Sequence, residues 1–277
     1  MKVPKDSFPF KVGNFECLAI SDGTFPVPGA QPGQSFGQYE MQPGQIMEVT
    51  GLFIRTPEHA VLIDTGWGVG VEPDAGKLLQ NLQAAGIQRT EIDTVILSHG
   101  HPDHIGGNTD AKGRLVFPNA RYIMSKEEWE FLTANPDLTQ LNIEESGRQT
   151  ILTSVQKNLI PIQDRLDLVD RDREILSGIE LIKAPGHSPG HIVLVISSDT
   201  EQLLCTGDLF RQPLELTQPD LYISSDFAPE QAIRTRAQII QRIIASNMLV
   251  FACHFPFPGL GHIVPKGEAW LWQPIET

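Results

Sequence analysis

A short segment of this 277-residue chain holds three histidines and one aspartate within six consecutive positions. The segment reads SHGHPDHIGG, and Pro102 with the glycine pair that follows permits a sharp reversal of the chain. Imidazole nitrogens and carboxylate oxygens are the donors that borderline divalent metals bind at neutral pH, and a turn after a strand can aim several of them at one point. The spacing predicts a metal-ligand cassette of His99, His101, Asp103 and His104.

Three later polar residues share one pattern, in which an apolar strand-like run ends at a donor. They are His187 in KAPGHSPGH, Asp208 in LLCTGDLF and His254 in LVFACHFPFPG. One such strand end means little alone, but the cassette and these three positions together supply five imidazoles and two carboxylates. That number of donors suits two metal ions.

The predicted elements explain how these side chains reach one place. The apolar run at 92–98 delivers the chain directly into His99. Strands cluster in two halves with helices between them, which predicts two packed sheets with helices outside. Strands are predicted at 15–22, 47–54, 60–64, 92–98, 120–124, 166–169, 179–183, 192–197, 202–206 and 249–253, and helices at 74–85, from 125 onward, 144–158 and 229–245.

Composition and charge narrow the function classes. Hydrophobic residues make up 40% of the chain and charged residues 20%, which is ordinary for a globular protein and consistent with a single domain over 1–277. The formal net charge of −13 disfavours a general nucleic-acid binder. We find no run of about 18 apolar residues and no signal peptide, so we expect no membrane interaction and a cytoplasmic location.

The three cysteines, Cys17, Cys205 and Cys253, lack CxxC spacing and lie in apolar runs. This pattern predicts buried free thiols in a reducing compartment. If strand alternation holds, the side chains of Cys205 and Cys253 point away from the neighbouring donors.

These residues resemble the metallo-β-lactamase superfamily, whose H-x-H-x-D-H signature occurs at 99–104. The turn at 64–66 (DTG), the GHSPGH segment, the TGD at 206–208 and the final His254 follow in the superfamily's order. Within it, HFPFPGLGH, the LLQNLQAAG after the DTG turn and KEEWEF look similar to the methyl parathion hydrolase group and the N-acyl homoserine lactone lactonases.

The resemblance implies an α+β fold, a four-layer αββα sandwich with the site at one edge. It implies one metal on His99, His101 and His187, and another on Asp103, His104 and His254, with Asp208 bridging both. Asp64 would orient a ligand histidine, as ligating imidazoles generally require, and His191 is a second candidate for such a supporting role.

The resulting hypothesis is a dinuclear metal-dependent hydrolase. Two cations sharing a water lower its pKa toward neutrality and yield a bridging hydroxide nucleophile, while one metal polarises the scissile oxygen. Asp103 and Asp208 are the expected catalytic carboxylates, with Asp103 hydrogen-bonded to the hydroxide and able to pass a proton to the leaving group. Zinc is the expected metal, with manganese, cobalt and iron left open by the ligand types.

The substrate side of the site is less well defined by the sequence. Lactonases of this group commonly carry a tyrosine three residues after the bridging aspartate, where this chain has Arg211, and Tyr222 is a candidate replacement. Aromatic residues near the donors favour a neutral, partly hydrophobic ester, lactone or phosphotriester, although each of them could equally pack in the core. The candidate pocket residues are Trp129, Phe210, Arg211, Tyr222, Phe255 and His262.

Two other functions remain open at this stage. A mononuclear iron oxidoreductase of the persulfide dioxygenase type shares much of the cassette, and a non-catalytic metal-binding relative would keep the ligands without activity. The expected partner is a small molecule. The Pro/Gly-rich stretch at 25–44 predicts a long surface loop that resembles an arm contributing to dimers in relatives, so a homodimer is also predicted.

Overall fold

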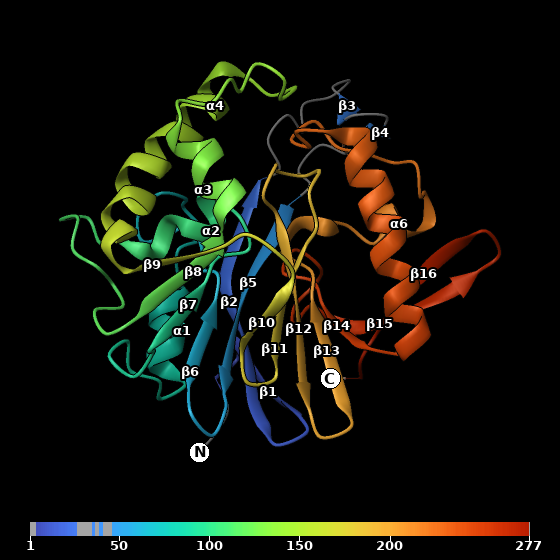
Figure 1. Ribbon diagram of the computed structural model, residues 1–277, viewed down its shortest axis with the longest axis horizontal. Helices are drawn as coiled ribbons and strands as arrows, with labels where there is room; N and C mark the ends of the chain where they lie inside the picture. The colour runs from blue at the N-terminus through green and yellow to red at the C-terminus, as the bar shows by residue number, and fades with distance from the viewer. Residues whose placement is uncertain (1–3, 27–34, 37–38, 41–45, 277) are drawn as a thin grey trace.

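A computed structural model describes residues 4–26, 35–36, 39–40 and 46–276 (Figure 1). Its first seven-stranded sheet has the order β1-β2-β5-β6-β7-β8-β9. Strands β6, β7 and β8 run parallel to one another, so their carboxyl ends meet at one edge. The strands are β1 (Ser7–Val12), β2 (Phe15–Pro26), β5 (Ile46–Arg55), β6 (Ala60–Ile63), β7 (Thr94–Ile96), β8 (Arg121–Ser125) and β9 (Leu166–Val169).

The second sheet also has seven strands and follows the chain order from β10 to β16. Its central pair, β13 and β14, is parallel, whereas the other neighbours are antiparallel. The strands are β10 (Arg173–Leu176), β11 (Ile179–Lys183), β12 (Ile192–Ser198), β13 (Glu201–Cys205), β14 (Leu249–Phe251), β15 (Leu260–Lys266) and β16 (Ala269–Pro274). The short strands β3 (Ser35–Phe36) and β4 (Tyr39–Glu40) pair separately.

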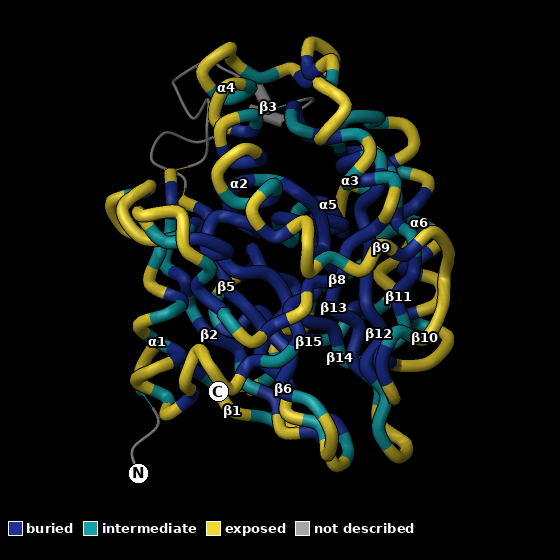
Figure 2. The backbone as a smooth tube through the Cα atoms, turned by 60° about the vertical axis from the view of Figure 1, so that its left-hand side comes forward, coloured by how far each residue is buried: buried dark blue, intermediate teal, exposed yellow. Residues whose placement is uncertain are grey.

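Strand alternation explains why both faces of the second sheet are covered. On β12, Leu194 belongs to the apolar cluster between the two sheets together with Ile54 of β5. Its neighbour Val195 points the other way and joins Ile240 in a separate cluster under a helix. A run of consecutive apolar residues is what a strand buried on both faces requires. Figure 2 shows this buried backbone running through both sheets.

Helices cover the outer faces and complete four layers, which confirms the predicted αββα sandwich (Figure 1). Helices α1 (Leu78–Ala84), α3 (Lys126–Thr133) and α4 (Glu145–Ser154) lie over the first sheet, and α6 (Pro229–Ser246) lies over the second. The remaining helical segments are α2 (Pro102–Ile105), α5 (Leu214–Thr217), η1 (Gly106–Asn108), η2 (Val155–Leu159), η3 (Ile160–Arg165) and η4 (Gly207–Leu209).

All ten predicted strands are present; besides the two-residue strands β3 and β4, the strands that were missed are β1, β10, β15 and β16. Three of these lie at sheet edges, where half-exposed residues and prolines blur the alternation on which the prediction depends. Helix α1 begins at Leu78 rather than at residue 74, because Gly76 has a φ of +80° and the buried carboxylate of Asp22 holds the preceding turn.

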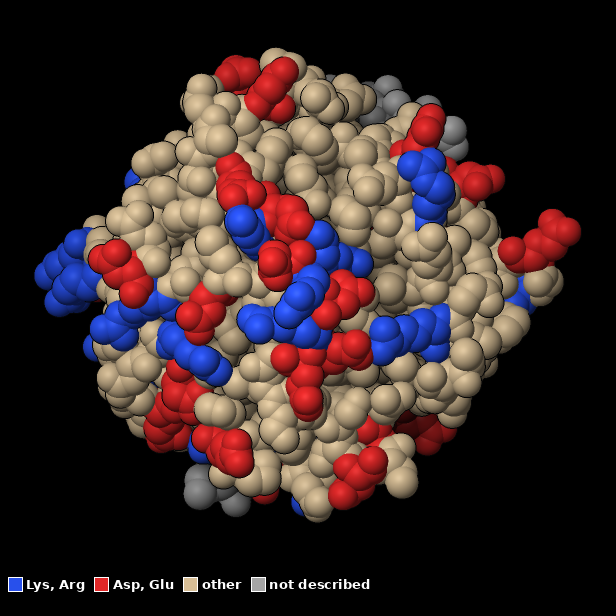
Figure 3. All heavy atoms as spheres, viewed as in Figure 1, with Lys and Arg blue, Asp and Glu red and all other residues tan. Residues whose placement is uncertain are grey.

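The predicted loop at 25–44 begins too early, since β2 continues to Pro26. Apart from β3 and β4, the rest of that loop lies outside the described residues. Acidic and basic side chains are interspersed on the face shown in Figure 3. Within the part of the chain that is described, no helix has the length and apolar character needed to span a membrane.

Candidate metal centre

The seven predicted donors all lie at one edge of the sandwich, where strands from both sheets end. Strand β7 leads into His99, β13 leads into Asp208 and β14 leads into His254. His187 lies in the loop between β11 and β12. His101 immediately precedes helix α2, and Asp103 and His104 lie within it. Side chains from positions more than 150 residues apart thus meet because parallel strands share one carboxyl edge.

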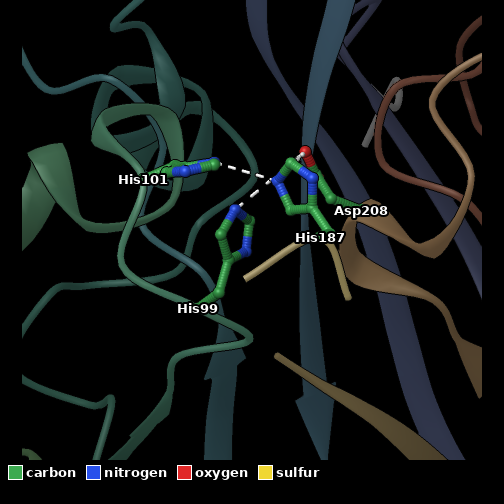
Figure 4. Close-up of side chains that lie close together, drawn as sticks. All are labelled: His99, His101, His187 and Asp208. Atoms are coloured by element: carbon green, nitrogen blue, oxygen red, sulfur yellow. Dashed lines mark hydrogen bonds and ion pairs between the residues drawn. The ribbon is translucent and has the colours of Figure 1, made fainter. Parts of the chain in front are cut away.

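A first cluster consists of His99, His101, His187 and Asp208, whose donor atoms lie within 4.8 Å of one another (Figure 4). Nδ1 of His101 is 2.9 Å from Nε2 of His187. Oδ2 of Asp208 is 3.3 Å from Nε2 of His187 and 4.0 Å from Nε2 of His99. Three imidazoles and a carboxylate around one point match the donor set of a four-coordinate metal ion.

A second cluster lies on the other side of the same aspartate. Oδ1 of Asp208 is 3.0 Å from Nε2 of His104 and 3.0 Å from Nε2 of His254. Oδ2 of Asp103 is 3.4 Å from both of these nitrogens. Asp208 therefore turns one oxygen toward each cluster.

Unpartnered nitrogen atoms in the two clusters fit metal ions. Nε2 of His99, His104 and His254 is buried and has no hydrogen-bond partner among the described residues, although an oxygen of Asp208 lies only 3.0–4.0 Å away. A buried lone pair that faces a carboxylate oxygen without a proton between them is unfavourable. A cation between the nitrogen and the oxygen removes that cost, so these residues fit divalent metals.

Hydrogen bonds at the far side of each ring determine which nitrogen faces the cluster. Nδ1 of His104 donates to Oδ2 of Asp64 at 2.8 Å, and Nδ1 of His254 donates to the backbone carbonyl of Glu48 at 2.6 Å. A neutral imidazole has a single N–H, so in their neutral form both rings would present the lone pair of Nε2 to the cluster. Asp64 thus makes the contact that was expected of it.

The side chain of His191 contacts the backbone of Asp208. Its Nε2 accepts a hydrogen bond from the backbone nitrogen of Asp208 at 3.0 Å, and its Nδ1 donates to the carbonyl of Ala184 at 3.1 Å. His191 is fully buried. It therefore holds the turn that presents Asp208 and does not itself face the donor clusters.

Burial keeps the first cluster in the form that binds metal. It lowers the pKa of His99 well below its usual value, that of His101 to about 4 and that of His187 to about 3. Neutral imidazole is the form that coordinates a cation.

In the second cluster, negative charge outweighs burial. Burial opposes protonation of His104, but Asp103 and Asp208 raise the pKa of His104 well above its usual value. Burial likewise opposes ionisation of Asp208, but His254 and His104 hold the pKa of Asp208 well below its usual value. The cluster consequently attracts positive charge, which a divalent cation would supply in place of protons.

A family model shows which family the chain belongs to. The model of the metallo-beta-lactamase superfamily matches residues 48–262, a range that contains all seven donors. The chain belongs to the metallo-beta-lactamase superfamily.

Relatives within the superfamily include lactonases. An N-acyl homoserine lactonase of Bacillus thuringiensis is 27% identical over 183 residues, covering 58% of this chain and 63% of the lactonase. The chain therefore matches less than two thirds of the length of that relative. A probable metallo-hydrolase of Bacillus subtilis, YflN, is 25% identical over 233 residues, covering 75% of this chain and 83% of the relative.

Solved structures give a similarity over nearly the whole chain. The dizinc quorum-quenching lactonase AidC, solved with the product N-hexanoyl-L-homoserine, is 29% identical with a TM-score of 0.89, and 98% of each chain is covered. The hydrolase AbOPH is 23% identical with a TM-score of 0.86, covering 100% of this chain and 99% of that one, which shows the shared superfamily fold.

Sequence reasoning missed Asp226, which supports the first cluster. Its Oδ1 accepts a hydrogen bond from Nδ1 of His187 at 3.0 Å and forms an ion pair with Arg211 at 2.7 Å. Burial opposes ionisation, but Arg211 and His187 lower the pKa of Asp226. Asp226 follows no recognisable motif and lies 39 residues from its partner, so no local signal could have revealed it.

Arg211 therefore has a different setting from the one expected. It is buried, donates to Asp226 and to Oγ of Ser225 at 2.6 Å, and sits behind His187. A guanidinium so engaged positions a supporting carboxylate, and the expectation that it faces the substrate is wrong.

The predicted aromatic pocket is also revised. Phe210 and Phe255 are fully buried in the core under α6, so they do not line a pocket. Trp129 is half-buried and packs against the core of the first sheet. Tyr222 and His262 are half-buried, and no contact of either with a donor is observed in the described residues. The cleft beside His101 and His187 is instead lined by Glu128, Phe131, Leu132, Leu138, Leu141, Ile151, Ser188, Pro189 and Phe227.

Cys253 also departs from expectation. Its Sγ lies 3.7 Å from Oδ1 of Asp208 and donates to the carbonyl of Gly207 at 3.5 Å, so its side chain does not point away from the donors. Strand β14 ends at Phe251, two residues earlier, and strand alternation no longer applies there. All three cysteines are free and buried, as predicted.

A much larger groove of about 810 Å³ lies elsewhere, along the loop at 68–71 and the segment at 106–117. Its lining contains none of the seven donors. The size of a cavity therefore does not locate the chemistry in this molecule.

Proposed function

We propose that this protein is a dinuclear metal-dependent hydrolase. The observation that carries the proposal is the position of Asp208, whose Oδ1 lies 3.0 Å from His104 and His254 while its Oδ2 lies 3.3 Å from His187. A carboxylate with one oxygen toward each of two donor clusters is suited to bridging two cations. A single-ion site needs only one of these clusters.

The proposed division of the residues between the two ions is the one that the superfamily resemblance implies. His99, His101 and His187 would hold one, Asp103, His104 and His254 the other, and Asp208 both. Two divalent ions there would polarise the scissile oxygen and activate a water for attack. Zinc is proposed first, because nitrogen and oxygen donors in this number suit it and AidC is a dizinc enzyme. Manganese, cobalt and iron accept the same donors.

Asp103 is the proposed proton carrier. Burial opposes its ionisation, but His104 and His254 lower the pKa of Asp103 to about 2. Its carboxylate is therefore ionised at neutral pH and can accept a proton from the attacking water. The same group can then return that proton to the leaving alkoxide.

The proposed substrate is a neutral lactone or ester with an apolar acyl group, with a phosphotriester as a further candidate. Support comes from the AidC lactonase and from the cleft that starts at His101 and His187. Phe131 and Phe227 form its aromatic wall, edge to face with ring centroids 4.9 Å apart. Apolar walls beside a polar centre favour a substrate whose acyl part is hydrophobic.

The cleft is narrow in this conformation. Its free volume of about 10 Å³ accommodates about one water molecule. Entry of an acyl chain therefore requires Leu138, Leu141 or Ile151, which lie on the segment over the cleft, to move outward.

Metal analysis paired with hydrolysis tests the proposal. Protein purified without chelator should contain about two metal ions per chain and hydrolyse an acyl lactone, an aryl ester or a phosphotriester. One iron per chain, oxygen consumption and no hydrolysis would support the oxidoreductase instead. Full metal occupancy with no turnover of any of these substrates would support a non-catalytic relative.

A further inference from the structure

Helix α3 carries a buried carboxylate that the proposed mechanism does not use. Glu128 is 1% exposed, although glutamate is rarely buried without partners. It lies behind the donors, on the side of α3 that faces the two loops bearing the first cluster.

Every hydrogen bond of the Glu128 side chain goes to one of those two loops. Oε1 accepts from the backbone nitrogen of Gly100 at 2.9 Å, between the donors His99 and His101. Oε2 accepts from Oγ of Ser188 at 2.7 Å and from the backbone nitrogen of Gly190 at 2.9 Å. Ser188 directly follows His187, so one carboxylate ties together both loops of the first cluster.

Two glycines let the loops approach the helix closely enough for these bonds. A Cβ atom on Gly190 would lie 2.1 Å from the backbone nitrogen of Glu128, and one on Gly100 would lie 2.0 Å from Cδ1 of Leu132. A side chain at position 190 would push its loop away from the backbone of α3, and one at position 100 would displace the side chain of Leu132. The hydrogen bonds of Glu128 therefore depend on close packing of both loops against α3.

We propose that Glu128 is a positioning residue that sets the separation of the two loops and so preforms the first metal site. The two loops place Nδ1 of His101 2.9 Å from Nε2 of His187, so that both nitrogens face the same point of the first cluster. This inference rests on the proposed function, because it assigns those two nitrogens to one metal ion.

The carboxylate is chemically suited to this task and an amide is not. Three donors converge on two oxygens that both act only as acceptors. In Glu128→Gln one of the two positions becomes an NH₂ group, which faces an N–H and cannot bind it. One loop is then released while the volume of the side chain stays the same.

Asp22 offers a matched control. It is also buried, and it accepts three backbone N–H groups, from Trp67 at 2.9 Å, Gly76 at 3.1 Å and Leu78 at 2.8 Å. Two of these bonds fix the turn before α1 and the third holds the backbone of Trp67 after β6, and neither segment carries a donor of either cluster. Asp22→Asn therefore removes the same kind of interaction from a place that does not hold a metal ligand.

The experiment compares zinc binding to chelator-stripped wild type, Glu128→Gln and Asp22→Asn by calorimetric titration, with cobalt(II) absorption as a report on ligand geometry. In Glu128→Gln we expect one ion to bind about 10–100-fold more weakly, the other to keep its affinity, and the cobalt spectrum of the weakened site to change. Asp22→Asn should lower the melting temperature and leave both affinities and the spectrum unchanged. If Glu128→Gln does not fold, Ser188→Ala, which removes only the 2.7 Å bond, should weaken the same single ion.

The outcomes separate the two proposals. The positioning role is overturned if folded Glu128→Gln binds both ions with wild-type affinity. Where Glu128→Gln does not fold, the same result in Ser188→Ala overturns it. In both cases the proposed dinuclear hydrolase is unaffected. Equal weakening in Asp22→Asn also overturns it, because any buried carboxylate would then have the same effect. A wild-type chain that binds fewer than two ions overturns the proposed function and this inference with it.

Discussion

Oδ1 of Asp226 lies 3.0 Å from Nδ1 of His187 and carries an ion pair to Arg211 through the same atom. A single buried oxygen therefore both orients a donor histidine and neutralises a buried guanidinium. The two functions can be tested separately, because His187 and Arg211 are different partners of this oxygen and each can be changed in turn.

Asp226→Asn should weaken both metal binding and stability. His187 loses its charged acceptor, which should lower the affinity for one ion about 10–100-fold. Arg211 is left buried without its counter-charge, at a cost of about 3–5 kcal/mol in the free energy of unfolding. Calorimetric zinc titration and denaturant unfolding measure the two effects.

Arg211→Met is the matched control for that variant. It removes the guanidinium but leaves Asp226 bonded to His187, so we expect a loss of stability with metal affinity close to that of wild type. Metal affinity that falls equally in the two variants would contradict the assignment of Asp226 to His187.

Asp208→Ala should abolish most of the activity and remove at least one of the two ions. The reason is that both donor clusters lose the oxygen that faces them. Elemental mass spectrometry of the purified variant gives the count. Asp110→Ala, which removes an exposed partner of Arg114, should keep two ions. Retention of both ions by Asp208→Ala would contradict its bridging role.

The positions of the donors could be predicted from the sequence because each follows a strand, and strand ends are visible in the hydrophobic pattern. His99, Asp208 and His254 come after β7, β13 and β14, which were all predicted. The four-layer fold followed from the same strands. Periodicity within one segment reports where a side chain lies relative to its own strand, and that is enough to find an edge where several strands end.

Asp64 was predicted from the DTG turn, but the other residues that support the donors could not be predicted, because their contacts are not local. Asp226 meets His187 only through tertiary packing, and Glu128 contacts loops 28 and about 60 residues away. The backbone carbonyl that orients His254 comes from Glu48, 206 residues earlier. Such contacts have no local sequence signal, because only the packed sandwich brings the segments together.

Asp93 should make stability depend on pH outside the metal centre. Partial burial opposes its ionisation, but the backbone nitrogen of Ala60, Thr94 and His59 lower the pKa of Asp93. A carboxylate with a lowered folded-state pKa stabilises the fold above the unfolded pKa of about 3.9, and that contribution is lost as the pH falls through the folded value. Asp93→Asn should therefore be less stable than wild type at pH 7 and equal to it at strongly acidic pH.

Urea unfolding across that pH range measures the difference. Asp167→Asn provides a control, since the side chain of Asp167 is seen, in the part of the chain that is described, to make a single exposed ion pair, to Arg121 at 3.4 Å. A gap between wild type and Asp93→Asn that stays constant down to acidic pH would show that the contribution is not electrostatic.

Removal of metal should destabilise the fold. Ions that bind only the folded chain add about 4 kcal/mol each when their concentration is about 1,000 times the dissociation constant. Without them, the unpartnered nitrogens of His99, His104 and His254 remain buried. Calorimetry of chelator-stripped protein should show a lower melting temperature that added zinc restores. An unchanged melting temperature would mean that no ion contributes to the fold.

Phe131→Ala should reduce the preference for long acyl chains. Phe131 and Trp129, two residues earlier on α3, both pack against the core of the first sheet, but of the two only Phe131 also lines the cleft next to His101 and His187. Because methylene groups buried in an apolar pocket each contribute about 1–3 kcal/mol, the ratio of kcat/KM for decanoyl and butanoyl lactones should fall about tenfold or more. Trp129→Ala should lower the melting temperature but keep that ratio. If Trp129→Ala changes the ratio and Phe131→Ala does not, the aromatic wall lies where the sequence first placed it, and the acyl group does not occupy the cleft beside His101.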